Sequence, residues 1–393
     1  MKVKRNNILI VLAVFCTALM TRAPISSIGQ LIPFIQTDLN LSAAAAGSVT
    51  TLISVMFALM SPLGGYLSVK VDTKKLIYIS ILLTFASTLL RTSLGSLGLF
   101  TGTLLIGAAL GVLNIQLPIL IRNQFPQKVG LYMGLYSSTM TISNGLAFAT
   151  VTPLMNWSGS WQNSLRILAL LAVPALIIWL LLPGNSISFG ESKVKLDISW
   201  SKMRPFLPLG LLYGMQGLLY FSTTAWLPSI LMEQGRSSTV SAFLMVLLQL
   251  ISLPTNFTCG SIMQRSSKKW QMALLASILF LSGLFFIIFA QGRLALQITA
   301  ILLLGLGNGI MFAMPYALLG FSGKNYEENT NISTFVLLIG YTLAATGPIA
   351  LGYLYDLTQN WTVPIVFMMV CTVAYFIFGK KAGDFVETEL QKS

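Results

Sequence analysis

The feature that most constrains this chain is a series of long, uninterrupted apolar runs, such as 8–20, 165–182 and 272–290. A membrane-spanning helix needs about 20 apolar residues, whereas the strands of a membrane β-barrel alternate apolar and polar side chains. Of the 393 residues, 55% are hydrophobic and only 9% are charged, against about 25% charged in ordinary soluble proteins. This composition excludes a water-soluble fold and a disordered chain. The runs therefore predict an all-α integral membrane protein.

Twelve apolar segments are long enough to cross a bilayer, and only short polar connections lie between them. The predicted transmembrane helices are 8–35, 43–69, 76–93, 98–121, 131–153, 163–182, 205–231, 239–263, 271–290, 295–320, 332–355 and 361–379. No large extramembrane domain fits in the remaining chain.

The basic residues predict how these helices are oriented. If the N-terminus is cytoplasmic, most of the 24 Lys and Arg residues fall in cytoplasmic segments, and Arg91, Arg166, Arg236 and Arg293 fall outside. This asymmetry is the positive-inside rule, so both termini are expected on the cytoplasmic side of the cell membrane. The net charge of +13 is thereby explained by topology, and nucleic-acid binding is not expected.

The chain divides near its middle into two halves. A polar stretch at 183–204 is predicted to be a cytoplasmic linker between an N-terminal six-helix half, 1–182, and a C-terminal six-helix half with a short tail, 205–393. The loop 65–75 pairs with 260–269 at an offset of 195 residues. Such a repeat predicts two pseudo-symmetric halves, an architecture of transporters that hold their substrate midway between the halves.

The two repeated loops resemble the signature G-x-L-x-D-R-x-G-R-K of the major facilitator superfamily. In this chain Val69 and Gln264 replace the Asp of the signature. The resemblance implies the major facilitator fold and a conformational or gating role for the loop residues that fit it, which are Gly65, Lys70, Lys74, Gly260, Arg265 and Lys268.

Further motifs, spread over nearly the whole chain, resemble the cyanate permease and 2-nitroimidazole exporter (CynX/NimT) family. They include Arg22 with Pro24, Asn114 with Pro118, Trp226 with Pro228, Gly340 with Tyr341, and Gly347 with Pro348. The family resemblance implies transport of small polar or anionic solutes and does not point to one particular solute.

Arg22 is the most informative single residue, because it falls near the middle of the first predicted helix. An arginine at the bilayer centre costs about 2.5–3.5 kcal/mol on insertion scales, and all 11 acidic residues map to loops, helix ends or tails. One interpretation is that Arg22 binds an anion in a water-filled cavity through its fork of donors. The alternative is a structural arginine, hydrogen-bonded to backbone carbonyls that Pro24 leaves free.

Other polar residues are predicted to line the same cavity. Ser26 follows Arg22 by four residues and shares its helix face, and Gln216, Tyr220 and Thr223 form a stripe on the seventh helix that the offset places opposite Arg22. Such stripes also serve as contacts between membrane helices, so both interpretations stay open. Further substrate-binding candidates are Asn114, Gln116, Gln249, Asn308 and Tyr341.

What the sequence lacks also limits the function. There is no His, and all three Cys lie in apolar runs, so no metal site, cofactor or disulfide is expected, and an intramembrane enzyme lacks its reactive groups. Without an intramembrane acid as proton relay, we predict a uniporter or exchanger of a small anionic or polar solute that works by alternating access. A monomer in the lipid bilayer would suffice.

One alternative to this prediction stays open, and a second is not supported by the sequence. A broad-specificity drug or nitroheterocycle exporter on the same fold would fit the 17 Met and 23 Phe residues. A sensor or scaffold would need a soluble domain, for which the tails are too short.

Overall fold

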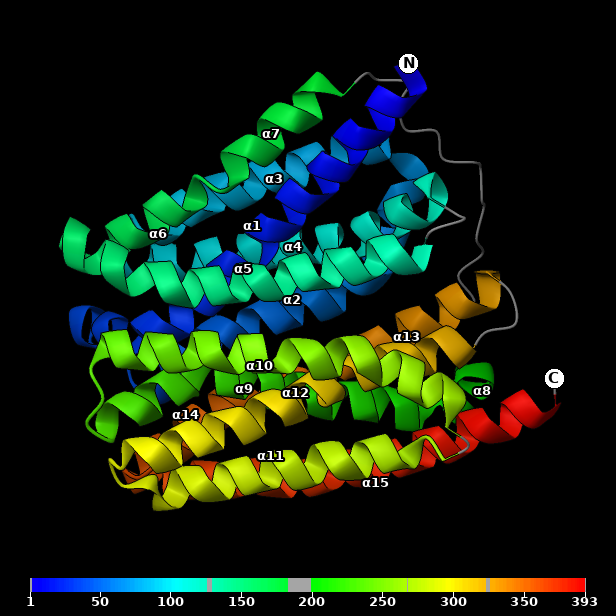
Figure 1. Cartoon of the computed structure of the whole chain (residues 1–393). Helices are drawn as coiled ribbons and strands as arrows, with labels where there is room; N and C mark the ends of the chain where they lie inside the picture. The colour runs from blue at the N-terminus through cyan, green and yellow to red at the C-terminus, as the bar shows by residue number, and fades with distance from the viewer. Residues whose placement is uncertain (1, 126–128, 183–198, 267, 323–325, 393) are drawn as a thin grey trace. The chain divides into compact units, whose positions relative to one another are not determined.

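The computed structural model describes residues 2–125, 129–182, 199–266, 268–322 and 326–392, and within them it contains helices and turns but no strand (Figure 1). Most of the predicted linker 183–204 lies outside the described residues.

Each of the twelve predicted spans corresponds to one helix or to two consecutive helices. In chain order the first elements are α1 (Lys2–Leu39), α2 (Ala43–Lys70), α3 (Thr73–Arg91), α4 (Gly95–Gln124), α5 (Val129–Ser158), α6 (Trp161–Ala169) and α7 (Ala172–Leu181). They are followed by α8 (Trp200–Met203), a 3-10 turn (Arg204–Phe206), α9 (Leu207–Glu233), α10 (Ser238–Arg265), α11 (Trp270–Ala290), α12 (Leu294–Ser322), α13 (Tyr326–Ala344), α14 (Thr346–Thr358) and α15 (Thr362–Lys392).

Within the described residues, ten helical stretches are long and apolar enough to cross a membrane. The other two spans, α5 and α9, are 30 and 27 residues long, which at about 1.5 Å per residue also exceeds a hydrocarbon core of about 30 Å. The protein is an all-α integral membrane protein with two pseudo-symmetric sets of six spans.

The chain packs as two compact units. The first comprises Met1–Asn40 and Val55–Lys193, and the second comprises Leu41–Ser54 and Val194–Ser393. The N-terminal part of α2 therefore belongs to the second unit, although the rest of that helix belongs to the first. The predicted boundaries of the two halves, 1–182 and 205–393, do not include this exchange and stay a prediction.

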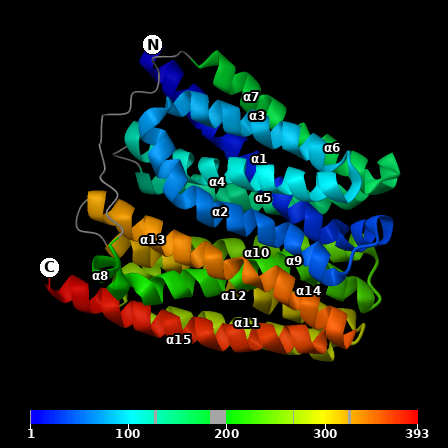
Figure 2. The ribbon, with the colours of Figure 1, turned by 180° about the vertical axis from the view of Figure 1, so that it is seen from behind.

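In the first unit, α1 packs against α5, α6 and α7, while α3 packs against α4 and α7. Figure 1 shows α6 and α7 running almost in line along α3. In the second unit, α9 contacts α10, α12, α13, α14 and α15, and nearly every residue from Leu209 to Leu231 is buried. Helix α9 is therefore covered on all sides by other helices of its unit. Figure 2 shows α13 and α14 following one another, with α15 beside α14.

Two of the predicted spans are interrupted, and a proline explains each break. The span at 163–182 divides between α6 and α7. Pro174 has no N–H to donate to the carbonyl of Leu170, and the amide of Val173 donates to that carbonyl instead. The span at 332–355 divides at Ala345, four residues after Tyr341 and three before Pro348. A proline removes one helical hydrogen bond and crowds the preceding turn, so the prediction of continuous helices was wrong at these two points.

Two glycines, Gly111 in α4 and Gly309 in α12, allow close packing of helices. A Cβ atom on Gly111 would lie 2.7 Å from the side chain of Met60 in α2, and one on Gly309 would overlap the carbonyl oxygen of Ser252 in α10.

The repeat is also visible in hydrogen bonds. The indole Nε1 of Trp161 donates to Asp38 at the end of α1, at 2.9 Å. Correspondingly, the indole Nε1 of Trp361 donates to Glu233 at the end of α9, at 2.8 Å. The two carboxylates are 195 residues apart, which is the offset found in the loops. Each unit thus joins the end of its first span to the start of its last by the same kind of bond.

The exchanged segment Leu41–Ser54 fits tightly against α14. The carboxylate of Asp356 accepts hydrogen bonds from the amides of Ala43 and Ala44, at 2.9 and 2.8 Å, at the beginning of α2. One turn later, a Cβ atom on Gly47 would overlap the carbonyl oxygen of Pro348. The contact between these two backbones is therefore close along successive turns.

Candidate functional site

The buried polar part of α1 is the centre of the candidate site in the first unit. Arg22 is only 6% exposed, although it carries a permanent charge in an apolar helix. It is one of a continuous set of buried polar side chains on α1, which comprises Thr17, Thr21, Arg22, Ser26, Ser27 and Gln30. So much polar surface inside a membrane helix is costly, and this makes α1 the first candidate for a functional helix.

Helix α5 supplies polar partners to this part of α1. The hydroxyl of Ser26 donates to Oδ1 of Asn144, and that of Ser143 donates to the carbonyl of Leu19. Since residues four apart share a helix face, Arg22 lies on the same side of α1 as Ser26, next to α5. Asn144 was not among the residues predicted from the sequence, although its position in a Ser-Asn pair within an apolar span was a signal.

A second buried guanidinium lies in the first unit. Arg91, the last residue of α3, is fully buried, and its Nη1 donates to the carbonyl of Pro24 at 2.7 Å. Its Nε and Nη2 have no hydrogen-bond partner among the described residues. Arg91 was predicted to lie in an outside segment, and its burial was not predicted. The side chain extends from the end of α3 back toward α1.

The candidates on α4 are placed differently from each other. Gln116 is fully buried, and its Nε2 donates to the carbonyl of Gly64 in α2 at 3.1 Å, so this side chain joins two helices. Asn114 is half-buried on the same helix.

In the second unit, four of the candidates are buried on α9, α10 and α12. Gln216 and Tyr220 lie on α9 with 4% and 7% exposure, Gln249 lies on α10 with 4%, and Asn308 lies on α12 with 9%. Tyr341 is half-buried on α13.

Tyr341 belongs to a cluster of three tyrosines. The hydroxyl of Tyr213 lies 2.7 Å from that of Tyr316 and donates to that of Tyr341 at 3.1 Å. Neither Tyr213 nor Tyr316 was named from the sequence. A signal was present, since Tyr213 and Tyr220 are seven residues apart and therefore lie on one face of α9.

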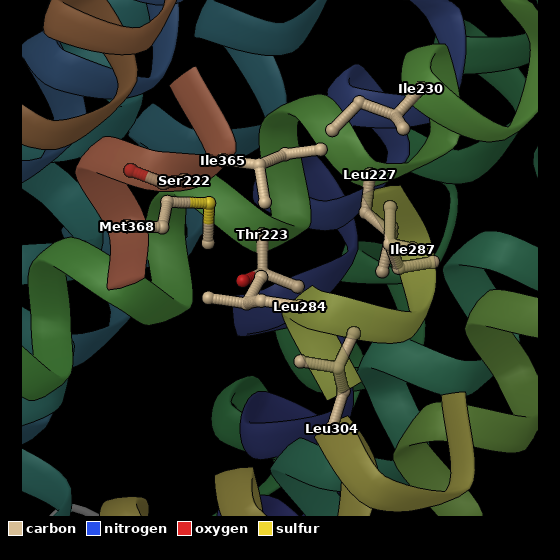
Figure 3. A pocket seen from close by; sticks show the side chains of 9 residues that line it. All are labelled: Ser222, Thr223, Leu227, Ile230, Leu284, Ile287, Leu304, Ile365 and Met368. Carbon is tan, nitrogen blue, oxygen red and sulfur yellow. The ribbon is translucent and has the colours of Figure 1, made fainter. Parts of the chain in front are cut away.

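A small cavity accounts for Thr223, the third member of the predicted stripe on α9. Figure 3 shows its hydroxyl among aliphatic side chains of α9, α11, α12 and α15, including Leu284, Ile287 and Ile365. The volume of about 10 Å³ is at the lower limit for one water molecule. The stripe therefore divides, because Tyr220 contacts the ring of Phe312 while Thr223 faces this internal cavity, which is too small for a solute.

The residues of the two signature loops lie at helix ends. The Nζ of Lys74, in the first turn of α3, donates to the carbonyl of Leu182 after α7. Arg265 and Lys268 are exposed at the end of α10, and Gly260 has open space around it. The remaining two, Gly65 and Lys70, belong to α2, and their surroundings lie outside the described part.

Comparison with known proteins identifies the family. The sequence profile of the Major Facilitator Superfamily matches residues 10–327, which is well over half of the chain. The chain belongs to the Major Facilitator Superfamily. It is therefore a multi-pass membrane transporter of small molecules and not an enzyme.

Similar proteins extend over nearly the whole length. The uncharacterized transporter YycB of Bacillus subtilis is 30% identical over 97% of this chain and 94% of its own. The 2-nitroimidazole transporter of Escherichia coli is 28% identical over 96% of each chain, and the cyanate transport protein CynX of Escherichia coli is 26% identical over 91% and 92%. The resemblance to the cyanate and 2-nitroimidazole carriers is thus confirmed.

Solved structures agree on the fold. The nucleoside transporter NupG, in a mutant form, superposes with a TM-score of 0.76 at 12% identity, over 95% of this chain and 98% of NupG. At this identity the likeness concerns the fold alone.

Proposed function

We propose that this transporter carries a small anionic or polar solute across the cytoplasmic membrane and that Arg22 is its main binding charge. The observation that carries the proposal is the burial of the Arg22 guanidinium in the polar stretch of α1. An arginine keeps its charge in proteins, and its planar fork of donors matches the geometry of small oxyanions and carboxylates.

The named relatives support this class of solute. Cyanate is a small anion and 2-nitroimidazole a small polar heterocycle, and proteins named for their transport are 26% and 28% identical to this chain. Ser26, Asn114, Gln116, Gln216, Gln249 and Asn308 remain proposed contacts that supplement Arg22.

We infer the transport cycle from the family and the charge distribution. Each half rocks against the other so that the site opens alternately to either side of the membrane. The loops with Gly65 and Gly260 take part in this conformational change. The excess of basic residues in the segments on one side supports a cytoplasmic position of both termini. Coupling by exchange or uniport is consistent with the acidic residues at helix ends, such as Asp38 and Glu233.

A specific observation also favours a second candidate, an exporter of nitroheterocycles. Tyr213, Tyr316 and Tyr341 bring three rings together in the second unit, and such rings suit planar aromatic solutes.

The test is transport by purified protein in proteoliposomes, for wild type, Arg22→Gln and Arg22→Lys. The panel contains cyanate, bicarbonate, nitrate, nitrite, small carboxylates, neutral nitroheterocycles and cationic dyes, followed by charge movement and by exchange of labelled solute. We expect one or a few anions to be moved, and Arg22→Gln to slow them at least about tenfold, because hydrogen bonds to charged groups contribute about 1.5–3 kcal/mol.

The matched control is Arg293→Gln, which removes an exposed arginine and should transport like wild type. If Arg22→Gln folds and moves the anions at the wild-type rate, Arg22 is structural. A response to dyes alone would assign the protein to drug export.

A further inference from the structure

The second unit contains a continuous series of aromatic rings, which we call the aromatic ladder. Its members are Phe221, Tyr220, Phe312, Tyr316, Tyr213 and Tyr341. Successive ring centroids are 5.3, 6.2, 5.4, 5.4 and 5.5 Å apart. All five distances lie in the range in which aromatic rings attract one another, about 4.5–7 Å.

Three helices build the ladder. Tyr213 and Tyr220 share one face of α9, Phe312 and Tyr316 are four residues apart on α12, and Tyr341 comes from α13. Space for the ring of Tyr213 depends on Gly340 of α13, because a Cβ atom at Gly340 would overlap Cδ1 of Tyr213. The close approach of α13 to α9 thus serves to seat this ring.

The hydroxyl groups at one end of the ladder form a directed chain. The hydroxyl of Tyr213 has one proton, which it donates to Tyr341. In the 2.7 Å hydrogen bond between Tyr213 and Tyr316, the donor is therefore Tyr316. The phenol rings are held in fixed orientation by these bonds as well as by ring contacts. A ligand that meets them meets a preorganised surface, and preorganisation reduces the entropic cost of binding.

The ladder is also accessible at one member. Tyr213 and Phe221 are 3% exposed, whereas Tyr316 is 42% exposed. Phe312, next to Tyr316, is half-buried. A buried base of rings therefore supports one exposed ring.

We propose that the aromatic ladder is the surface on which this transporter stacks a planar, conjugated solute, such as an aromatic carboxylate or a nitroheterocycle. Tyr316 supplies the stacking face and Phe312 extends it. The inference rests on the proposed function, since it names the class of solute that the carrier prefers. It predicts selection by ring planarity in addition to selection by charge.

The experiment compares two probes with the same charge and similar size, benzoate and cyclohexanecarboxylate, and adds 2-nitroimidazole. Binding to the full chain in lipid nanodiscs is measured by titration calorimetry. We expect wild type to bind benzoate about three- to tenfold more tightly than cyclohexanecarboxylate, because stacking is available only to the planar ring.

The variants test whether the ladder causes this preference. Tyr316→Leu should bring the affinity ratio of benzoate to cyclohexanecarboxylate close to one and weaken 2-nitroimidazole by a similar factor, while Tyr316→Phe keeps the ring and should keep most of the ratio. Phe285→Leu is the matched control, because Phe285 is an exposed ring that pairs with Phe289 on α11 at 4.5 Å. If Tyr316→Leu does not fold, Phe312→Leu replaces it.

Equal binding of the two carboxylates by wild type, or an unchanged ratio in folded Tyr316→Leu, would overturn the proposal. Cyanate exchange in proteoliposomes separates it from the proposed function. If cyanate is moved in an Arg22-dependent way while ring planarity has no effect, only the ladder proposal fails. If no small solute is moved but benzoate binding depends on Tyr316, the ladder stands and the proposed function fails.

Discussion

At the scale of single residues, the first unit contains two buried arginines of different character. The position of Arg22 could be predicted, because hydropathy alone places it in the middle of a span. The burial of Arg91 could not, since a residue at the end of a helix next to a turn ordinarily extends its long side chain toward water. Here the side chain extends the other way and bonds the carbonyl of Pro24.

This difference leads to a prediction for Arg91. A buried charge that is incompletely hydrogen-bonded costs free energy, and an apolar side chain of similar volume avoids this cost. Arg91→Met should therefore raise the apparent melting temperature of the purified protein, or leave it unchanged, in a fluorescence melt in detergent.

The control for this prediction is Arg293→Met, at an exposed position, which should shift the melting temperature by very little. A fall of several degrees in Arg91→Met alone would show that its hydrogen bond to Pro24 stabilises the fold by more than the burial of its charge costs.

The candidate site could be predicted only in part, for a reason that acts at this scale. Polar residues in apolar spans are visible in a sequence, so Ser26 and Gln216 could be named. Which side chains meet across helices is not visible, because it depends on how each helix is rotated about its axis. Tyr213 and Tyr316 are 103 residues apart and were therefore missed. Thr223 was predicted to lie in one polar stripe with Gln216 and Tyr220, but it faces the small internal cavity instead.

At the scale of helices, the sequence predicts the twelve spans well because the membrane sets their length. Most helices begin or end a few residues beyond the predicted limits, since their last turns continue into the interface, and α15 continues to Lys392. The breaks before Pro174 and Pro348 were not predicted. Prolines also occur inside unbroken helices here, as Pro118 does in α4, so the residue type alone does not decide the outcome.

The beginning of α2 provides a prediction at this scale. Each carboxylate oxygen of Asp356 accepts one amide hydrogen bond from the first turn, where the helix dipole favours a negative charge. Asp356→Asn replaces one acceptor by a donor and should lower the stability by about 0.5–2 kcal/mol, as the loss of a helix cap does. The measurement is the apparent melting temperature of the full chain.

Asp384→Asn serves as the comparison, because Asp384 is exposed near the end of α15. Equal melting temperatures for both variants and wild type would contradict a capping role for Asp356.

At the scale of the whole molecule, the two units repeat one another in chemistry as well as in helix number. The bonds of Trp161 to Asp38 and of Trp361 to Glu233 are counterparts. We expect Trp161→Phe and Trp361→Phe each to lower the stability by about 1 kcal/mol through the lost hydrogen bond. Their effects on the melting temperature should add in the double variant, since distant sites without shared partners behave independently. A double variant much less stable than the sum would indicate that the units unfold as a coupled pair.

The division of α2 has a consequence for recombination among related carriers. A crossover in the linker would seem to exchange one complete half of the gene for another. It would nevertheless separate Ala43 and Gly47 from the residues of α14 that fit them, because Leu41–Ser54 packs with the second unit. A chimera that keeps its parental contacts must therefore transfer this short segment together with the C-terminal half, so the module that evolution can exchange intact is discontinuous in the gene.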